Sequence, residues 1–301
     1  MDFSAGAAWM NGKVIPVSEA KISVFDWGLT RSDITYDVVH VCDGAFFRLD
    51  DYLDRFEFSM QKLRLDVGMD RRAIRSALIM LIATSGLQSA YVSMVASRGV
   101  PIIPGTRDPR TCVNHFYAWA VPFIWVFPED VAKRGVHLSV GHDTRRIPSN
   151  SVNPTVKNYH WGDMTAALFQ ALDEGYDSTI LLDYNDLITE GPGFNIFAVI
   201  DGRVVTPKSG MLEGISRKTV FEICEELSIP CESADIHKDD FMNAEEVFTA
   251  TTAGGLVPVT RVNGYILGND IIGPMTEKLS RYYWEWHKRD DLVLKIPYNT
   301  T

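Results

Sequence analysis

Four short motifs occur in a fixed order between residues 157 and 255: KNYHWGD (157–163), TEGPGFNIF (189–197), LEGISRKTV (212–220) and TATTAGG (249–255). They supply, in turn, a lysine, a carboxylate beside a glycine-rich turn, a glycine at the start of a helical segment and a second glycine-rich turn. An amine, a carboxylate and two sets of backbone N–H groups are what a protein needs to hold pyridoxal 5′-phosphate (PLP). The ordered set, more than any single motif, therefore predicts a PLP site in this stretch.

The first motif contributes Lys157, which is the only lysine or arginine between Arg146 and Arg203. Its neighbours Val156 and Tyr159 indicate a partly buried setting. Burial lowers the pKa of a lysine because the ammonium loses hydration, and covalent bonding to an aldehyde requires the neutral amine. The alternative is an ordinary lysine at the end of a strand.

The second motif places Glu190 directly before the turn Gly191-Pro192-Gly193. A carboxylate fixed at such a turn can accept a hydrogen bond from the pyridine nitrogen of PLP and keep that nitrogen protonated, which makes the ring an electron sink. The alternative is a solvated acid in a hairpin.

The third and fourth motifs are candidate phosphate sites. Gly214-Ile215-Ser216 opens a helical segment, and the free N–H groups of a helix start bind anions, with Ser216 suited to the N-cap position. The turn after residue 250 offers hydroxyls and exposed amides from Thr251, Thr252 and Ala253. A plain capped helix and a glycine-rich strand end are the alternatives.

A further phosphate ligand is expected on the helix that begins at Asp50 and Asp51. Leu53, Phe56, Met60 and Leu63 recur in it at helical spacing. Arg55 of this helix can reach a phosphate with two donors, or it can form a surface ion pair with Asp51.

Composition excludes several classes of protein. The 301 residues carry a net charge of −10, which disfavours nucleic-acid binding, and 46% are apolar, as in soluble globular chains. The four cysteines lack metal-site spacing, so reduced thiols are expected. His137 and His142 are five residues apart on an expected strand, so they face opposite ways and are poor co-ligands of a metal. Neither a signal peptide nor a membrane segment is visible, and a cytoplasmic location is expected.

Alternating and helical patterns predict strands and helices along the whole chain. Hairpins are expected at Asn11-Gly12 and Asp43-Gly44, and a second helix over 70–84. Further strands are expected over 90–97, 113–121, 136–141, 179–183, 194–200, 203–206, 245–250 and 257–262. Further helices are expected over 161–175, 215–228 and 273–288, the last rich in aromatic residues. Residues 122–134 show no clear period and are expected to connect two domains.

The motif order VKN, TEGxGFN, LxGISRK and TTAGG, with FRLDDYLDR upstream, resembles the fold-type IV PLP transaminases. This family includes branched-chain, D-amino-acid and (R)-selective amine transaminases. The resemblance covers essentially the whole chain and is closest to the (R)-amine:pyruvate transaminases, in SDITYDVVHV, VPFIWV, RRIPSNSVNPTVKNYHWGD and TTAGGLVPVTRVNG. It implies an α/β fold of the D-amino-acid aminotransferase type: a small N-terminal α+β domain (1–121), the connection (122–134) and a large PLP-binding domain (135–301) with a β-barrel-like core.

The resemblance also implies roles for individual residues. Lys157 is the Schiff-base lysine and the base of the proton transfer, and Glu190 holds the pyridine nitrogen. The phosphate ligands are Arg55, Ile215, Ser216 and Thr252. The other cofactor-binding positions are Leu212, which packs on the ring, Phe194 and Asn195. The substrate-binding positions are Arg31, Tyr36, Val38, Tyr91, Arg107, Trp161, Thr251 and Ala253. A homodimer with both sites near its interface is implied as well.

The expected reaction is ping-pong transfer of an amino group from an (R)-amine to pyruvate, in which Arg107 on a mobile loop pairs with the keto-acid carboxylate. Four positions depart from the pattern of close relatives. Arg31 replaces a histidine, Pro192 a serine and Tyr91 a phenylalanine, and Ser93 occupies a position that is glutamate in some members. These departures bear on the substrate range, and the extra cation at Arg31 favours anionic substrates. The alternatives that stay open are a D-amino-acid or branched-chain aminotransferase, an aminodeoxychorismate-lyase-type enzyme and a non-catalytic small-molecule-binding protein on the same scaffold.

Overall fold

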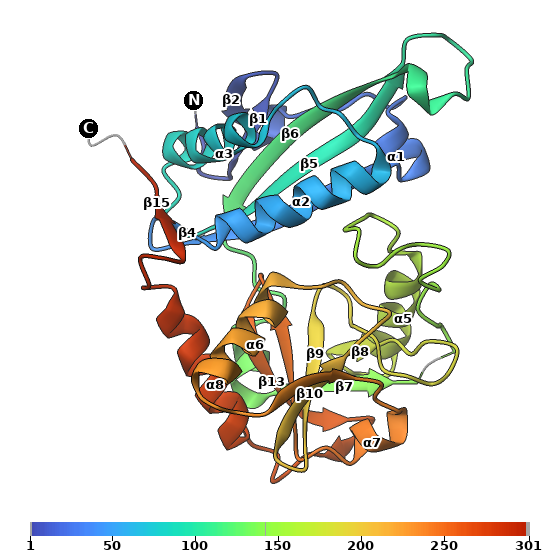
Figure 1. Cartoon of the computed structure of the whole chain (residues 1–301), viewed down its shortest axis with the longest axis vertical. Coiled ribbons are helices and arrows are strands. Elements are labelled where there is room, and N and C mark those ends of the chain that lie inside the picture. The colour runs from blue at the N-terminus through green and yellow to red at the C-terminus, as the bar shows by residue number, and fades with distance from the viewer. Residues whose placement is uncertain (1, 142, 299–301) are drawn as a thin grey trace. The chain divides into compact units, whose positions relative to one another are not determined.

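The computed structural model describes residues 2–141 and 143–298, so His142 lies outside the described residues. The chain forms two compact units (Figure 1). Of the described residues, unit 1 contains 2–124, 156–159 and 289–298, and unit 2 contains 125–141, 143–155 and 160–288.

Unit 1 is built on a seven-stranded antiparallel sheet with the strand order β15-β4-β3-β5-β6-β1-β2. Both hairpins expected from the sequence are confirmed, and the central residues of each turn have positive φ (51° and 80° at Asn11-Gly12, 48° and 75° at Asp43-Gly44), as tight hairpin turns require. The strands are β1 (Ala7–Met10), β2 (Lys13–Pro16), β3 (Ile34–Cys42), β4 (Ala45–Phe47), β5 (Ala90–Pro101), β6 (Cys112–Pro122) and β15 (Val293–Lys295).

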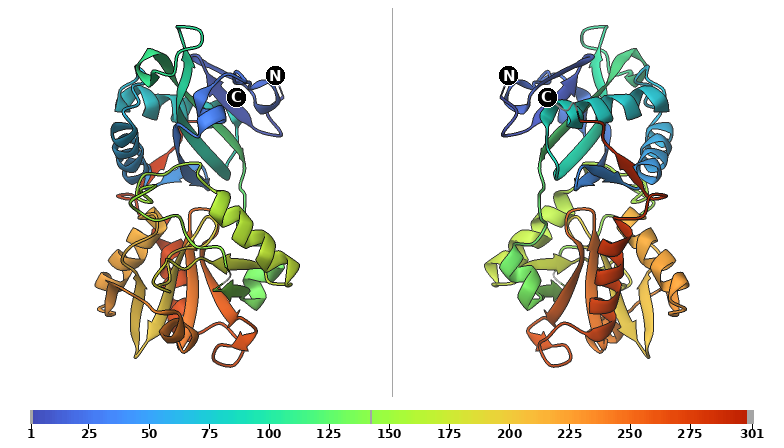
Figure 2. Two further views of the ribbon diagram at one scale, coloured as in Figure 1. Left: turned by 90° about the vertical axis from the view of Figure 1, so that its right-hand side faces the viewer. Right: turned by 90° about the vertical axis from the view of Figure 1, so that its left-hand side faces the viewer.

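Two long helices, α2 (Leu49–Leu63) and α3 (Arg71–Ser85), cover one face of this sheet, as Figure 2 shows. The periodicity of the sequence predicted both. Phe56 of α2 packs edge-on against Phe116 of β6, with ring centroids 6.2 Å apart, and both side chains are buried. Asp70 caps α3 by accepting from Ala73 N at 2.7 Å. Short helices η1 (Val17–Glu19), α1 (Trp27–Arg31) and η2 (Pro109–Thr111) complete the unit.

The opposite face of the sheet is lined by a separate cluster of side chains. Cross-strand partners share a face, and here Tyr36 pairs with Val95, Val38 with Ser93, and Val95 with Tyr117. Ile34, Tyr36, Val38 and Val95 form this cluster, with Tyr91 and Tyr117 packed against it. We call it the aromatic face; it contains three of the predicted substrate-binding positions.

Helix α1, which the sequence did not predict, begins at a buried carboxylate. Asp26 accepts from Gly28 N at 2.7 Å, from Ser97 Oγ of β5 at 2.5 Å and from His115 Nε2 of β6 at 2.6 Å. Burial raises the pKa of Asp26, but the hydrogen bonds from His115, Ser97 and Gly28 outweigh burial, so the pKa lies below its ordinary value. Gly28 is needed here, because an added Cβ would lie 2.2 Å from Ser97 Oγ.

We expect Asp26→Asn to lower the free energy of unfolding by about 1–3 kcal/mol at pH 7, since it removes a buried charged acceptor. The folded-state pKa of Asp26 is depressed, so this stabilisation is present above the ordinary pKa of about 4 and is lost as the pH falls further. Urea unfolding at pH 7 and pH 3 measures it. Asp70→Asn is the matched control, because Asp70 is an exposed N-cap and asparagine caps equally well. An equal deficit at both pH values would contradict the prediction.

Unit 2 contains a mixed sheet with the order β11-β10-β9-β12-β13-β7-β8, and β14 pairs with β13. Isolated bridges join Leu182 to Ile188 and Leu187 to His237, so hydrogen bonding continues from the end of β8 toward the end of β11 in a barrel-like manner. The strands are β7 (Val136–Val140), β8 (Ser178–Ile180), β9 (Asn195–Ile200), β10 (Arg203–Pro207), β11 (Cys231–Ala234), β12 (Glu246–Thr251), β13 (Gly255–Val262) and β14 (Tyr265–Ile266).

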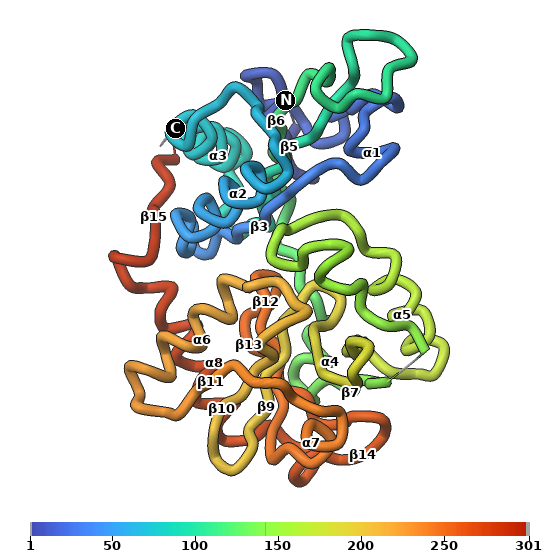
Figure 3. The backbone as a smooth tube through the Cα atoms, turned by 45° about the vertical axis from the view of Figure 1, so that its right-hand side comes forward, coloured from blue at the N-terminus to red at the C-terminus, as the bar shows by residue number. Residues whose placement is uncertain are grey.

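The helices of unit 2 are α4 (Glu129–Arg134), α5 (Gly162–Asp173), α6 (Ile215–Glu226), α7 (Lys238–Met242) and α8 (Pro274–Trp286). The three long ones and six strands match the expected elements, with ends shifted by a few residues. Helices α6 and α8 lie side by side (Figure 3). The aromatic helix α8 covers the sheet as expected: Tyr283 is fully buried, and Ser280 Oγ donates to Leu256 O of β13 at 3.2 Å.

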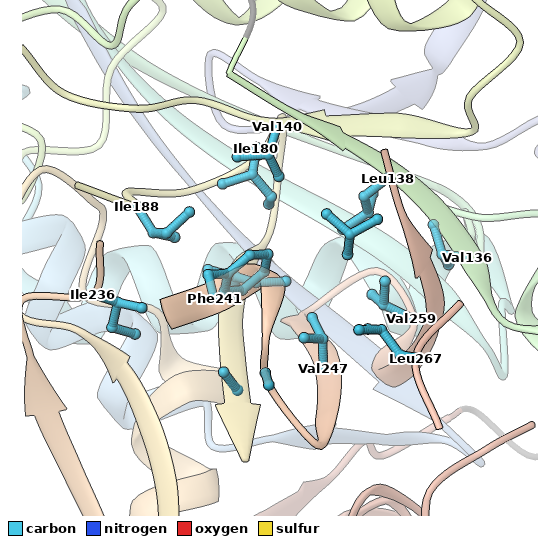
Figure 4. Packing of buried hydrophobic residues seen from close by; sticks show 14 of the residues in the cluster. Val136, Leu138, Val140, Ile180, Ile188, Ile236, Phe241, Val247, Val259 and Leu267 are labelled. Carbon is cyan, nitrogen blue, oxygen red and sulfur yellow. The ribbon is translucent and has the colours of Figure 1, made fainter. Parts of the chain in front are cut away.

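The hydrophobic core of unit 2 is formed by side chains from the strands of its sheet and from α7 (Figure 4). Val136, Leu138 and Val140 of β7 are spaced two residues apart, as expected for one face of a strand, and contribute three side chains to it; Ser139 on the other face is buried as well. Phe241 of α7 is fully buried among these strands, close to Ile188 and Ile236 in Figure 4.

The two units differ from the expected boundaries in three places. Residues 156–159, which include Lys157, belong to unit 1 and not to the expected large domain (135–301), because Asn158 bridges to Thr35 of β3. Residues 289–298 also belong to unit 1, because β15 adds to the edge of its sheet beside β4. The expected connection over 122–134 contains α4, and Phe127 is buried in the core of unit 2. All four cysteines are free thiols. In the part of the chain that the structure describes, helices long and apolar enough to cross a membrane are absent.

Candidate active site

The predicted site residues fall on both units. Unit 1 carries Lys157, Arg55 and the positions Arg31, Tyr36, Val38, Tyr91 and Arg107. Unit 2 carries Glu190, Phe194, Asn195, Leu212, Ile215, Ser216, Trp161, Thr251, Thr252 and Ala253.

Lys157 is held by its backbone along β3 of unit 1. Thr35 Oγ1 donates to Lys157 O at 2.6 Å, Lys157 N donates to Ser59 Oγ of α2 at 3.3 Å, and Thr35 and Asn158 form a β-bridge. The side chain is half-buried, and Lys157 Nζ lies 4.6 Å from the centroid of the Tyr36 ring. The backbone of Lys157 is therefore fixed at two atoms, and its amine lies over the aromatic face.

The aromatic face continues from Tyr36 to other phenols. Tyr159 stacks on Tyr36 with centroids 4.3 Å apart and planes at 4°, and Tyr91 stacks on Trp119 at 5.6 Å. Burial raises the pKa of Tyr117 to about 12, and Asp26 adds to the effect. Burial likewise raises the pKa of Tyr91 and Tyr159, so these phenols stay protonated and keep their hydroxyl donors at neutral pH.

Ser93 lies among these rings on β5 and is 1% exposed. Burial raises the pKa of Tyr159, and the Ser93 hydroxyl acts in the opposite direction, so the two side chains lie near each other. They nevertheless lack the geometry of a hydrogen bond, and Ser93 Oγ makes none within the described residues. A buried hydroxyl without a partner costs free energy, which makes Ser93 a notable position on this face.

Arg55 pairs with Asp37 of β3 across the helix-covered side of the sheet. Its Nε and Nη2 donate to the two carboxylate oxygens at 2.8 and 2.7 Å. Burial lowers the pKa of Arg55, but the charge and hydrogen bonds of Asp37 outweigh it and raise the pKa above its ordinary value. The sequence did not indicate the pairing of Arg55 with Asp37. The expected contact of Arg55 with a phosphate stays a prediction.

Arg31 and Arg107, the other two arginines among the predicted site residues, are exposed. Arg31 at the end of α1 stacks on Trp27, with the guanidinium carbon 3.4 Å from the ring centroid. Arg107 lies in the loop between β5 and β6, where Asp108 pairs with Arg110 at 2.6 Å. Asp108, the sequence neighbour of Arg107, is thus paired with Arg110.

In unit 2, Glu190 is buried and bonded on both oxygens. Oε1 accepts from Arg146 Nη2 at 3.0 Å and from Arg146 Nε at 3.3 Å, and Oε2 accepts from Leu212 N at 3.0 Å. Glu190 is 5% exposed, so the alternative of a solvated hairpin acid is excluded. A buried carboxylate that accepts from a cation and an amide is held in its charged form and in one orientation.

The turn after Glu190 is connected to the segment before α6. Asn195 Nδ2 donates to Leu212 O at 2.7 Å, and a Cβ added to Gly214 would lie 2.1 Å from Asn195 Oδ1. Phe194 packs against Phe127 in the core of unit 2, at 5.5 Å between centroids. Asn195 and Gly214 therefore set the position of the loop that carries Leu212.

The start of α6 differs from the expected capping. Gly214 is the N-cap and makes no side-chain capping bond, whereas Ser216 lies within the first turn and its Oγ is 3.0 Å from Tyr283 Oη of α8. The expectation of Ser216 as N-cap was wrong, because Gly214 already has the extended conformation of a cap and the serine hydroxyl faces α8. The first N–H groups of α6 have no partner within the helix, as at any helix start, and suit an anion.

The TTAGG turn is more constrained than expected. Thr251 Oγ1 donates to Gly193 O at 2.9 Å and accepts from Ala253 N at 3.2 Å, so the amide of Ala253 is not an exposed donor. Thr252 is half-buried. A Cβ on Gly193 would lie 3.6 Å from the Trp161 ring, which brings Trp161 beside the same turn.

These residues of unit 2 fit PLP. A buried, oriented carboxylate suits a pyridinium nitrogen, and the start of α6, which Leu212 precedes, suits a phosphate. The sequence missed Arg146 and Asp163, which support Glu190, because they are 44 and 27 residues away from it and no spacing rule links them. It also missed Tyr283, the partner of Ser216.

Comparison with known proteins agrees with this geometry. The model of the amino-transferase class IV family matches residues 35–262. The chain belongs to the class IV aminotransferases. It is a fold-type IV aminotransferase, and its cofactor is PLP.

Among its relatives, a putative branched-chain-amino-acid aminotransferase of Methanocaldococcus jannaschii is 31% identical over 91% of this chain and 94% of its own length. A D-alanine aminotransferase of Staphylococcus haemolyticus is 26% identical over 90% and 94%. The structure of a branched-chain aminotransferase of the thermophilic archaeon Thermoproteus uzoniensis with norvaline matches with a TM-score of 0.85 and 25% identity, over 97% of this chain and 99% of that one.

Proposed function

We propose that this aminotransferase moves the amino group of an (R)-amine to pyruvate, giving a ketone and alanine, by a ping-pong mechanism. The observation that carries the proposal is the aromatic face beside Lys157. Tyr36, Val38 and Tyr91 give it an apolar surface, and lysine and arginine are absent from the positions of β3, β5 and β6 on this face. An apolar face of this kind suits the aryl or alkyl group of an amine better than it suits a carboxylate.

The residues divide the chemistry between them. When bound, PLP takes up the amino group and delocalises the electron pair released at the substrate carbon. Lys157 binds the cofactor covalently and, once released, moves the proton at the substrate carbon with its Nζ. The backbone bonds of Lys157 to Thr35 and Ser59 restrict the path of that amine. Glu190 accepts from the pyridine nitrogen, and the start of α6, Thr252 and Arg55 bind the phosphate.

Two residues would adapt the site to a keto acid. Arg107, exposed on its loop, is proposed to pair with the carboxylate of pyruvate, since it is not engaged by Asp108 in the way Arg110 is. Ser93 Oγ lies buried on the aromatic face without a partner within the described residues, and a polar group of the substrate would satisfy it. A homodimer is part of the same proposal, by resemblance to the family.

A second candidate is an amino-acid aminotransferase, because the relatives found are described as branched-chain or D-alanine aminotransferases. In that case the carboxylate of every substrate would need a cation, and Arg107 or Arg31 would have to serve in both half-reactions. A lyase of the aminodeoxychorismate type is a further alternative, and it would be recognised by the release of pyruvate in the absence of an amino acceptor.

The purified holoenzyme is tested with pyruvate and (R)-1-phenylethylamine, with (S)-1-phenylethylamine as the matched stereochemical control. L-leucine and D-alanine are tested as donors with 2-oxoglutarate. We expect acetophenone from the (R)-amine, with a kcat/KM at least about tenfold above the values for both amino acids. A single favourable contact in an apolar pocket changes kcat/KM by about that factor. A higher kcat/KM for L-leucine or D-alanine would replace the proposal by the second candidate.

A further inference from the structure

Arg146 is a buried arginine at the centre of a three-residue ion network in unit 2. It lies after β7, its backbone N donates to Leu182 O at 2.9 Å, and the residue is 7% exposed. Its guanidinium uses Nη1 for Asp163 Oδ2, at 2.7 Å, and Nη2 and Nε for Glu190 Oε1. Both carboxylates have side chains that are 6% exposed.

Asp163 fixes the other end of the network. Its Oδ2 also accepts from Ile147 N at 2.8 Å, and its Oδ1 accepts from Met164 N at 2.8 Å in the first turn of α5. The carboxylate is therefore anchored to the segment that carries Arg146 and to a helix start. Because both oxygens of Asp163 are held in this way, the Arg146 guanidinium that is bound to Asp163 has little freedom to leave Glu190.

The charges in the network are one cation and two anions. Burial lowers the pKa of the Arg146 guanidinium, but the charges of Glu190 and Asp163 and their hydrogen bonds outweigh burial and raise it, so the cation is permanent. A buried carboxylate without a cation costs several kcal/mol or takes up a proton. Arg146 prevents this at Glu190, while Asp163 offsets the positive charge, so one net negative charge is left for a cationic ligand.

We propose that Arg146 is a positioning residue for the cofactor: with Asp163 as its counter-charge, it keeps Glu190 ionised and aimed at the pyridine nitrogen of PLP. The proposal rests on the proposed contact of Glu190 with that nitrogen. It assigns to Arg146 a contribution to PLP affinity without any contact between Arg146 and the cofactor or the substrate.

Arg146 also lines a cavity of about 210 Å³ in unit 2, together with Thr189, Ser209 and Gly210. The cavity gives a small cation access to the position of the guanidinium. An Arg146→Ala variant can therefore take up guanidinium from solution, which provides a test of charge that is separate from folding.

The experiment measures the dissociation constant of PLP on the apoenzyme by titrating the protein fluorescence, and the thermal midpoint of the apoenzyme. We expect Arg146→Met to weaken PLP binding at least about tenfold, because it leaves a buried carboxylate unpaired. Arg146→Lys retains the charge but not the two-donor contact, so its affinity should lie between the two. Millimolar guanidinium should restore affinity in Arg146→Ala and leave the wild type unchanged.

Arg145→Met is the matched control, since Arg145 is the preceding residue and pairs with the exposed Asp186 at 2.6 Å; PLP binding should not change. Glu190→Gln distinguishes the two levels of the proposal. If Glu190→Gln weakens PLP binding and adding Arg146→Met weakens it no further, Arg146 acts through Glu190. If Glu190→Gln weakens binding but Arg146→Met does not, the inference on Arg146 is overturned alone. If Glu190→Gln leaves binding unchanged, the proposed role of Glu190 fails.

A structural role alone predicts a different pattern. Arg146→Met would then lower the apoenzyme's thermal midpoint and would weaken PLP binding equally in the presence and absence of Glu190→Gln, which would overturn the inference. If Arg146→Met does not fold, Arg146→Lys carries the test: unchanged PLP affinity in that variant with an unchanged thermal midpoint would overturn the inference as well.

Discussion

Replacing Lys157 with alanine is expected to abolish transamination, with turnover falling by at least about 10³-fold. The variant loses both the amine that binds the cofactor and the base that moves the proton, and positioned acid–base catalysis alone accounts for about 10²–10⁴. Lys157 Nζ is the amine over the aromatic face, 4.6 Å from the Tyr36 ring centroid. The visible absorption band of the lysine-bound cofactor should be lost with the activity, and both are measured on one purified sample.

Two companion variants separate chemistry from charge. Lys157→Arg keeps a cation over Tyr36, but a guanidinium remains protonated and cannot form the covalent bond, so this variant should be as inactive as alanine. Lys62→Ala is the control, because Lys62 is an exposed lysine whose Nζ lies 5.3 Å from the Phe58 ring centroid on α2. Full activity in Lys157→Ala, or equal losses in Lys62→Ala, would refute the assignment of Lys157.

Replacing Phe241 with alanine is expected to destabilise unit 2 by about 3–5 kcal/mol. The ring is fully buried in the core drawn in Figure 4, and alanine would leave a cavity that the strands around it cannot close. Because domains have small net stabilities, such a loss is a large part of the total. Urea unfolding followed by circular dichroism gives the change in free energy.

The control for this prediction is Phe169→Ala on α5. Phe169 is 64% exposed, so the same substitution should change the stability by less than about 0.5 kcal/mol. If the two variants were equally stable, the placement of Phe241 in the core would be wrong.

Local elements could be predicted where one segment carries its own pattern. The hairpin at Asn11-Gly12 and helices α2 and α3 needed only turn chemistry and periodicity, because the interactions that form them are local. Short elements such as α1, α7 and β15 gave no such signal. Helix α7 is five residues long, too short for a periodic pattern, and β15 forms because β4 offers an edge far away in the sequence.

The site divides in the same way. The motifs indicated Lys157 and Glu190, because a lysine or an acid next to characteristic turn residues can be recognised within a few residues of sequence. Their supporting partners did not: Ser59 and Thr35 hold the backbone of Lys157, and Arg146 holds Glu190. The error on Ser216 has the same origin, because its hydroxyl is oriented by Tyr283 of α8, 67 residues away.

The sequence by itself determined the order of the cofactor-binding motifs, the class of enzyme and most of the regular elements, because these depend on residue types at short spacing. Only the tertiary structure decided that Glu190 is buried in an ion network, that Arg55 pairs with Asp37, and that Tyr36, Tyr91 and Ser93 share one face of a sheet. Burial, charge pairing and cross-strand neighbours depend on which distant segments meet, and only the folded chain brings these segments together.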